Sequence, residues 1–172
     1  NNFTISPLLR HKTFNLTGVI YQEQVEIVSA TAHFMKAVEA LKGLEKEYKR
    51  EIAGVFMNMA ILACHSKNFV ESLEALGEAT KYMEELDFNL GMFRCYHTYG
   101  NVYNELNDLD NAELFYRKSL KIVQKLDSPQ DLANTYSNLS SVAEKRNDFE
   151  KALRLVRKSL TINQKLNSAA VI

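Results

Sequence analysis

The sequence predicts an all-α protein made of four similar helical hairpins. Turn-forming residues are scarce, with six Gly and two Pro in 172 residues, which favours long helices joined by short connections. The segments 117–120 and 157–160, forty residues apart, share the sequence Arg-Lys-Ser-Leu. Extending this register in both directions gives four copies, spaced by 42, 40 and 40 residues, that take up nearly the whole chain.

Small and large side chains recur in phase across these copies. One column of small residues holds Gly18, Ala60, Gly100 and Ser140, and another holds Ala30, Ser72, Ala112 and Ala152. A column of mostly large residues holds Phe34, Leu76, Tyr116 and Val156. Small side chains let crossing helices approach closely, and large ones fill the gaps between hairpins. Because one hairpin cannot bury its own apolar face, we expect the copies to be stabilised by stacking on one another.

Each copy is predicted to contain two helices joined by a short turn. The copies span residues 7–48, 49–88, 89–128 and 129–167, and we expect residues 168–172 to begin a further, truncated helix. Two helix starts carry a serine N-cap followed by proline, at Ser6-Pro7 and Ser128-Pro129. Two turns between helices are predicted at Asn107-Asp108 and Asn147-Asp148. The second helix of copy four has residues at helical steps of three and four that predict one buried stripe. They are Phe149, Ala152, Leu153, Val156, Ser159 and Leu160.

Composition and charge disfavour several classes of function. The 21 basic residues balance 21 acidic ones, so neither nucleic acid nor a membrane is expected as the main partner. No window approaches the roughly 20 uninterrupted apolar residues of a membrane span. Two cysteines do not make a disulfide framework, which favours a reducing, cytoplasmic location. The chain starts without Met and no polar capping helix follows Leu166, so we expect it to be part of a longer protein.

No pattern predicts catalysis, a metal site or a cofactor. Cys64 and His65 are adjacent, and adjacent helical residues point about 100° apart, so they do not form a nucleophile–base pair. The sequence lacks a Gly-rich phosphate loop and a Gly-x-Ser-x-Gly elbow. We therefore expect a non-enzymatic protein with neither cofactor nor metal.

The repeat pattern resembles the tetratricopeptide-repeat family. Ala30, Phe34 and Ala37 match the Ala-x3-Phe-x2-Ala core of that family's second helix, and Tyr99-Gly100 stands at its Leu-Gly pair. The periods of 40 and 42 residues are similar to the lengthened variant found in kinesin light chains, spindle-orientation adaptors and bacterial signalling proteins, including peptide-pheromone receptors. The resemblance implies a right-handed superhelical array of four hairpins.

The resemblance also implies a binding surface, because the first helix of each copy lines the concave face in this family. The candidate protein- or peptide-binding residues on that face are Lys12, Asn15, Asn58, Arg94, His97, Asn101, Asn104, Asn134 and Asn138. Carboxamides can bond both the N–H and the C=O of an extended peptide, and Arg94 could hold a carboxylate. The alternative interpretation is a solvated polar helix face. The family's clamp for chaperone C-termini is not predicted, because only Asn58 and Arg94 match it.

The function expected from the resemblance is a scaffold that captures a protein or peptide segment in the concave groove. The first alternative is the peptide-sensing region of a bacterial signalling or transcription regulator. The second is an architectural segment that associates with itself. The second helix of copy two is acidic and those of copies three and four are basic, which is compatible with a homo-oligomer or with steering of a charged partner.

Overall fold

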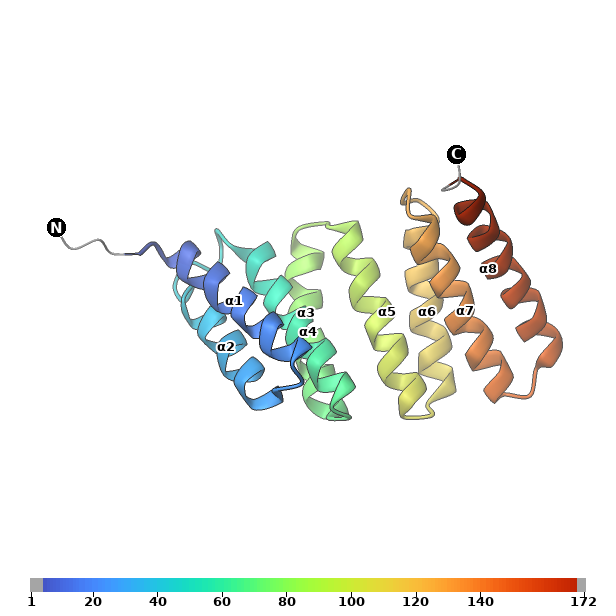
Figure 1. Ribbon diagram of the computed structural model, residues 1–172, viewed down its shortest axis with the longest axis horizontal. Helices are drawn as coiled ribbons and strands as arrows, with labels where there is room; N and C mark the ends of the chain where they lie inside the picture. The colour runs from blue at the N-terminus through green and yellow to red at the C-terminus, as the bar shows by residue number, and fades with distance from the viewer. Residues whose placement is uncertain (1–4, 170–172) are drawn as a thin grey trace. The chain divides into compact units, whose positions relative to one another are not determined.

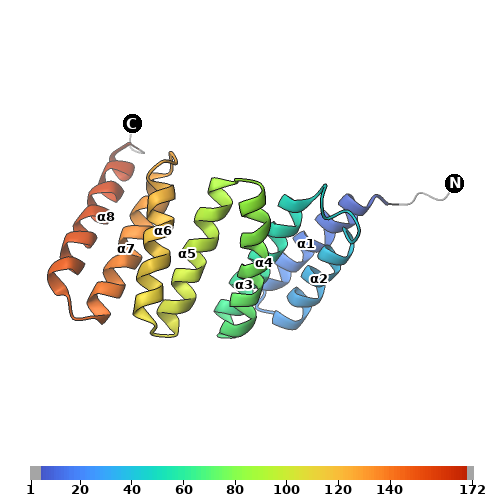
Figure 2. The same ribbon diagram turned by 180° about the vertical axis from the view of Figure 1, so that it is seen from behind.

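The computed structural model describes residues 5–169, and all regular structure in this range is α-helical. The eight helices are α1 (Pro7–Glu23), α2 (Ile27–Glu39), α3 (Lys49–His65), α4 (Phe69–Glu85), α5 (Asn89–Glu105), α6 (Leu109–Val123), α7 (Pro129–Lys145) and α8 (Phe149–Ala169). Figures 1 and 2 both show each odd-numbered helix beside the even-numbered helix that follows it. Each of the four sequence copies therefore contains one hairpin. The all-α fold class is confirmed.

The helices form two compact units. The N-terminal unit spans Asn1–Phe88 and contains α1 to α4, and the C-terminal unit spans Asn89–Ile172 and contains α5 to α8. In the N-terminal unit, α2 packs against α1 and α3, and α3 packs against α4. The same order recurs in the C-terminal unit, where α6 packs against α5 and α7, and α7 packs against α8.

The helix starts predicted from the Ser-Pro pairs are confirmed. Pro7 and Pro129 occupy the first turns of α1 and α7, where the missing N–H has no intrahelical acceptor in any case. The Ser6 hydroxyl accepts a hydrogen bond from the Leu9 N–H at 3.2 Å. The Ser128 hydroxyl instead donates to the Asp131 carboxylate at 2.6 Å.

The turn inside every hairpin uses one residue in the left-handed region. These residues are Val25, Lys67, Asn107 and Asn147, with φ between 58° and 62°. They stand at one repeat position, spaced like the copies themselves. In the C-terminal unit, the side chains of Asp108 and Asp148 follow as N-caps and accept backbone N–H groups. In the N-terminal unit, Glu26 and Asn68 make no side-chain cap bond.

The columns of small residues lie where helices cross. All four members of the first column and all four of the second are buried. A hydroxyl bridges the two columns in two copies: Ser72 donates to the Ala60 carbonyl at 2.8 Å, and Ser140 donates to the Ala152 carbonyl at 3.0 Å. The hydroxyl can therefore stand on either helix of the hairpin.

The last helix differs from its prediction in two ways. Ala152 and Ser159 of the expected stripe are buried and Leu155 packs on the core, but Phe149, Leu153, Val156 and Leu160 are exposed, because no described hairpin follows α8 to cover them. Residues 168 and 169 continue α8 and do not begin a new helix, since no Gly or Pro interrupts the chain after Leu166. The rest of that expected helix, residues 170–172, lies outside the described residues. Within the part of the chain that the structure describes, every helix is too short or too polar to span a lipid bilayer.

Candidate functional site

In the N-terminal unit, the first helices present a pair of carboxamides. The Asn58 side chain on α3 donates from Nδ2 to Oδ1 of Asn15 on α1, at 3.0 Å. Both residues are half-buried, and Lys12 is exposed one turn before Asn15. A carboxamide carries two donor hydrogens and an oxygen with two lone pairs, so this single bond leaves each side chain capacity for further bonds.

In the C-terminal unit, three of the candidate residues form a larger network. Asn138 on α7 donates from Nδ2 to Nε2 of His97 on α5 at 2.9 Å, and the same nitrogen lies 3.4 Å from Oδ1 of Asn101. That oxygen also accepts the Tyr116 hydroxyl from α6 at 2.8 Å. All three candidates are half-buried, whereas Tyr116 is buried.

These two pairs obey the same register rule. Asn15 and Asn58 are 43 residues apart, and His97 and Asn138 are 41 apart, one more than the local repeat spacing in each case. Within each unit, a polar residue in the first helix of one copy therefore contacts the first helix of the next copy. The contact lies one residue beyond its own repeat equivalent. The structure therefore brings Asn15 to Asn58, and His97 and Asn101 to Asn138.

The environment of His97 favours its neutral form. Burial holds the pKa of His97 below its ordinary value, against a smaller opposing effect of the Asp131 carboxylate. The ring also packs against Phe93 and Tyr116, with centroid distances of 5.7 and 5.8 Å. Because the Asn138 amide nitrogen can only donate, Nε2 of His97 must accept, which requires the neutral ring with its proton on Nδ1.

The other candidates lie outside these networks. Arg94 on α5 and Asn134 on α7 are exposed, and Oδ1 of Asn134 accepts a bond from Gln130 one turn earlier at 3.1 Å. The backbone carbonyl of Asn104 accepts the Lys145 ammonium at 2.7 Å. Oδ1 of Asn104 is buried and has no partner among the described residues. Nor is any group of three or more His, Cys, Asp and Glu within the described range placed to hold a metal.

Sequence reasoning missed the part that Tyr116 plays in this network. The signal was present in the repeat columns, because copy one has Phe34 and Val19 at the positions where copy three has Tyr116 and Asn101. A buried phenol needs a hydrogen-bond partner and a buried phenyl ring does not, so the two positions change together. Asn101 is accordingly a partner of a core tyrosine as well as a candidate contact for a ligand.

Comparison with known proteins identifies the family. Sequence models of the tetratricopeptide repeat match residues 51–125 and 132–169. The chain belongs to the tetratricopeptide-repeat family. A search of curated protein sequences gave no significant match.

Several solved structures share the fold. BtubC from P. vanneervenii is 24% identical, with a TM-score of 0.87 over 96% of this chain and 67% of that one. Aspartyl phosphate phosphatase F from Bacillus subtilis is 19% identical, with a TM-score of 0.83 over 94% of this chain and 42% of its own. A Rap protein complexed with competence and sporulation factor is 17% identical, with a TM-score of 0.79 over 95% of this chain and 46% of its own. The chain thus spans less than half of the two latter proteins, and these likenesses show the fold alone.

Proposed function

We propose that the chain is a non-catalytic scaffold that binds a protein or peptide segment along the polar faces of its first helices. The observation that carries this proposal is the paired arrangement of Asn15 with Asn58 and of His97 with Asn138. Both pairs are half-exposed and follow one register rule in two units of different sequence. A solvated helix face would not require that correspondence.

The chemistry of the pairs suits an extended peptide. Such a peptide presents alternating N–H and C=O groups, and a carboxamide can bond to both kinds. Pairing between neighbouring helices fixes the side-chain rotamers in advance, which reduces the entropy lost on binding. Arg94 on α5 and Lys12 on α1 are exposed and can pair with carboxylates of the ligand.

A second candidate is the peptide-sensing part of a signalling regulator. It is favoured by the fold shared with the Rap protein that was crystallised with competence and sporulation factor. In that case the bound segment would be a short free peptide, and its binding would act on parts of a longer protein.

The test is affinity capture from the source lysate, with mass spectrometry of both proteins and short peptides. Wild type is compared with Asn58→Ala and Asn138→Ala, and with Asn167→Ala as a control that removes an exposed carboxamide from α8. Circular dichroism checks that all four stay helical. A species retained by wild type and the control but lost by the first-helix variants supports the proposal. Equal capture by all four proteins would overturn it.

A further inference from the structure

The second helices of the N-terminal unit border a groove with an apolar floor. Its volume is about 620 Å³, and α2, α3 and α4 line it. The floor is α3, which packs against both α2 and α4 and contributes Phe56, Met59 and Leu62. One wall is the Ile27, Thr31 and Met35 face of α2. From Ile27 to Met35 this wall extends about 12 Å along α2, just over two helical turns.

The opposite wall carries a row of carboxylates. Glu71, Glu74 and Glu78 of α4 line the groove at spacings of three and four residues and are exposed. No ion pair found among residues 5–168 includes any of them. The groove therefore joins an apolar floor to a negatively charged edge with helical periodicity.

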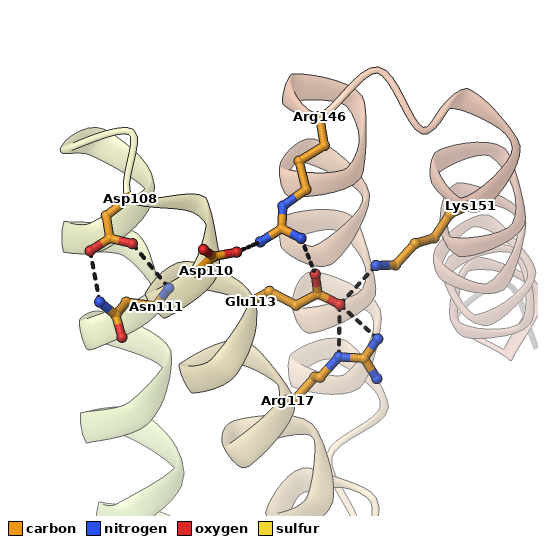
Figure 3. Close-up of polar contacts among 7 residues, drawn as sticks. All are labelled: Asp108, Asp110, Asn111, Glu113, Arg117, Arg146 and Lys151. Atoms are coloured by element: carbon orange, nitrogen blue, oxygen red, sulfur yellow. Dashed lines mark hydrogen bonds and ion pairs between the residues drawn. The ribbon is translucent and has the colours of Figure 1, made fainter.

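The equivalent positions of the C-terminal unit hold an ion cluster instead (Figure 3). Its centre is Glu113 of α6, which accepts Lys151 of α8 at 2.8 Å and Arg117 of α6 at 2.7 Å. Arg146 at the end of α7 pairs with Glu113 at 3.3 Å and also with Asp110. Burial alone would raise the pKa of Glu113, but Lys151 and Arg117 outweigh it and hold that pKa below its ordinary value.

The repeat register shows how the two units differ. Thr31, Ser66 and Glu71 of the N-terminal groove stand where the C-terminal unit has Glu113, Arg146 and Lys151. The N-terminal unit thus has Thr31 in place of the central Glu113 and Ser66 in place of Arg146. It has an acid, Glu71, in place of Lys151. Glu74 and Glu78 likewise stand where α8 has Arg154 and Lys158. Along this wall the sign of the charge is reversed.

Helices α2 and α4 of the N-terminal unit also differ from α6 and α8 in their exposed apolar side chains. Val28 is 85% exposed, Val70 is 68% exposed and Met35 is 61% exposed. The C-terminal unit has a charged residue at the repeat equivalent of each of these three, namely Asp110, Glu150 and Arg117. Clusters of exposed apolar residues bordered by charge are typical of docking surfaces.

We propose that this groove docks an amphipathic helix of a partner protein, with its apolar side chains on the α3 floor and Lys or Arg residues opposite Glu71, Glu74 and Glu78. A helix satisfies its own backbone hydrogen bonds, which suits an apolar floor, whereas an extended strand would leave its N–H and C=O groups unpaired there. The carboxylate row fits cations spaced by three and four residues. This surface is separate from the first-helix residues of the proposed peptide site.

The test uses the whole chain and a synthetic peptide of the stated chemistry. The probe is a fluorescein-labelled peptide with the sequence of residues 149–166, which carries apolar residues at helical spacing and basic residues beside them. A second peptide has every Lys and Arg replaced by Glu. Fluorescence anisotropy should show binding of the basic peptide with a dissociation constant below about 100 μM and no binding of its charge-inverted counterpart.

Variants locate the peptide on the chain. Glu71→Lys/Glu74→Lys/Glu78→Lys should weaken binding about 30-fold or more, whereas Glu84→Lys, an exposed change on α4 outside the groove, should change it less than about threefold. Thr31→Glu/Ser66→Arg/Glu71→Lys transplants the ion cluster of the other unit and should abolish binding while the chain stays folded. Asn58→Ala should leave the affinity unchanged, which separates this surface from the proposed first-helix site.

Three results would overturn the proposal. The first is the absence of binding up to about 1 mM peptide. The second is an affinity that the triple Glu→Lys change leaves intact or that Asn58→Ala abolishes, because the peptide would then lie elsewhere. The third is self-association of the unliganded chain that the triple change removes in sedimentation equilibrium. That result would make a second copy of the chain the occupant instead of a separate partner.

Discussion

The N-terminal and C-terminal units have the same hairpin architecture but differ in how their charges and turns are arranged. The C-terminal unit has Asn-Asp turns with side-chain caps and an ion cluster across α6, α7 and α8. The N-terminal unit has uncapped turns and an open groove at the equivalent positions. Both retain the buried columns of small residues, and the large residues Phe34, Leu76 and Tyr116 are buried as well. The architecture therefore requires a particular side-chain size at the helix crossings. It does not require a particular charge at the exposed positions, which can differ between the two units.

The largest expected effect tests this size requirement. A Cβ atom built on Gly18 would lie 2.6 Å from ring carbons of Phe34, and one built on Gly100 would collide with Tyr116. Both rings are buried and cannot move aside easily. Gly18→Ala and Gly100→Ala should each lower the free energy of unfolding by about 2 kcal/mol, measured by urea unfolding followed by circular dichroism.

Two controls separate overpacking from helix propensity. A Cβ on Gly54 of α3 meets no atom within 4 Å, so Gly54→Ala should raise the free energy of unfolding by about 0.5 to 1 kcal/mol. The pair Gly18→Ala/Phe34→Leu reproduces the Ala60 and Leu76 combination of copy two. It should be more stable than the sum of the two single changes predicts. Simple additivity would contradict the pairing of the two columns.

Removal of the central carboxylate of the ion cluster is expected to have the second largest effect on stability. Glu113→Gln should lower the free energy of unfolding by about 1 to 2 kcal/mol at neutral pH, because Arg146 and Lys151 lose their common partner. Glu78→Gln, a change of the same kind in the open groove, should alter it by less than about 0.5 kcal/mol. Equal effects in the two units would contradict the difference drawn between them.

The depressed pKa of Glu113 also predicts a pH dependence. A carboxylate with a lowered folded pKa stabilises the chain above its unfolded pKa of about 4.3, and this stabilisation is lost as the pH falls through the folded value. Urea unfolding between about pH 3 and pH 5 should therefore show a steeper loss for wild type than for Glu113→Gln. Parallel profiles would exclude Glu113 as a source of the acid sensitivity.

The turn of the first hairpin provides a smaller and opposite effect. Val25 has φ of 62° and is 76% exposed, so a β-branched residue occupies the left-handed region without compensating burial. Asn107 stands at the same position of copy three with φ of 58°. Val25→Asn should raise the free energy of unfolding by about 1 kcal/mol, and Asn107→Val should lower it by a similar amount. Differential scanning calorimetry of both variants would measure the two shifts.

Much of the fold could be predicted because side-chain size and turn chemistry act locally. Pro7 and Pro129 mark the helix starts, and Asn107 and Asn147 occupy the left-handed turn positions. Val25 gave no such signal, since its conformation follows from the hairpin and not from its own preference. Val25 stands at the repeat position of Asn107 and Asn147, so the period of the sequence carries information about this turn that the residue itself does not.

The outer stripe of α8 and the networks of the first helices could not be predicted in the same way. Val156 follows the large-residue column but is exposed, because burial depends on whether another helix covers that face. Candidate residues such as Asn58 lie on first helices, yet the sequence does not show that Asn58 reaches Asn15. That contact depends on the stagger between α1 and α3. The stagger places Asn15 opposite Asn58, which is one residue beyond its repeat equivalent.

The His97–Asn138 pair differs from the Asn15–Asn58 pair in one titratable ring, and this ring gives the smallest predicted effect on stability. His97 holds in the C-terminal unit the place that Asn15 holds in the N-terminal unit, and each accepts a bond from an asparagine one first helix later. Because burial lowers the folded pKa of His97, the stability that it contributes is complete above the unfolded pKa of about 6.5 and is lost as the pH falls through the folded value.

The substitution His97→Asn would reproduce the N-terminal pair and remove the titrating ring while retaining an acceptor for Asn138. The free energy of unfolding of wild type should fall by less than about 1 kcal/mol from pH 7 to pH 5, and the variant should show a flatter profile over this range. His65→Asn is the control, since His65 is exposed at the end of α3. A wild-type slope that survives in the His97→Asn variant would mean that other groups cause it and that protonation of His97 costs the folded chain little. In that event the pair is adaptable, which would itself suit a face that exchanges internal hydrogen bonds for those of a ligand.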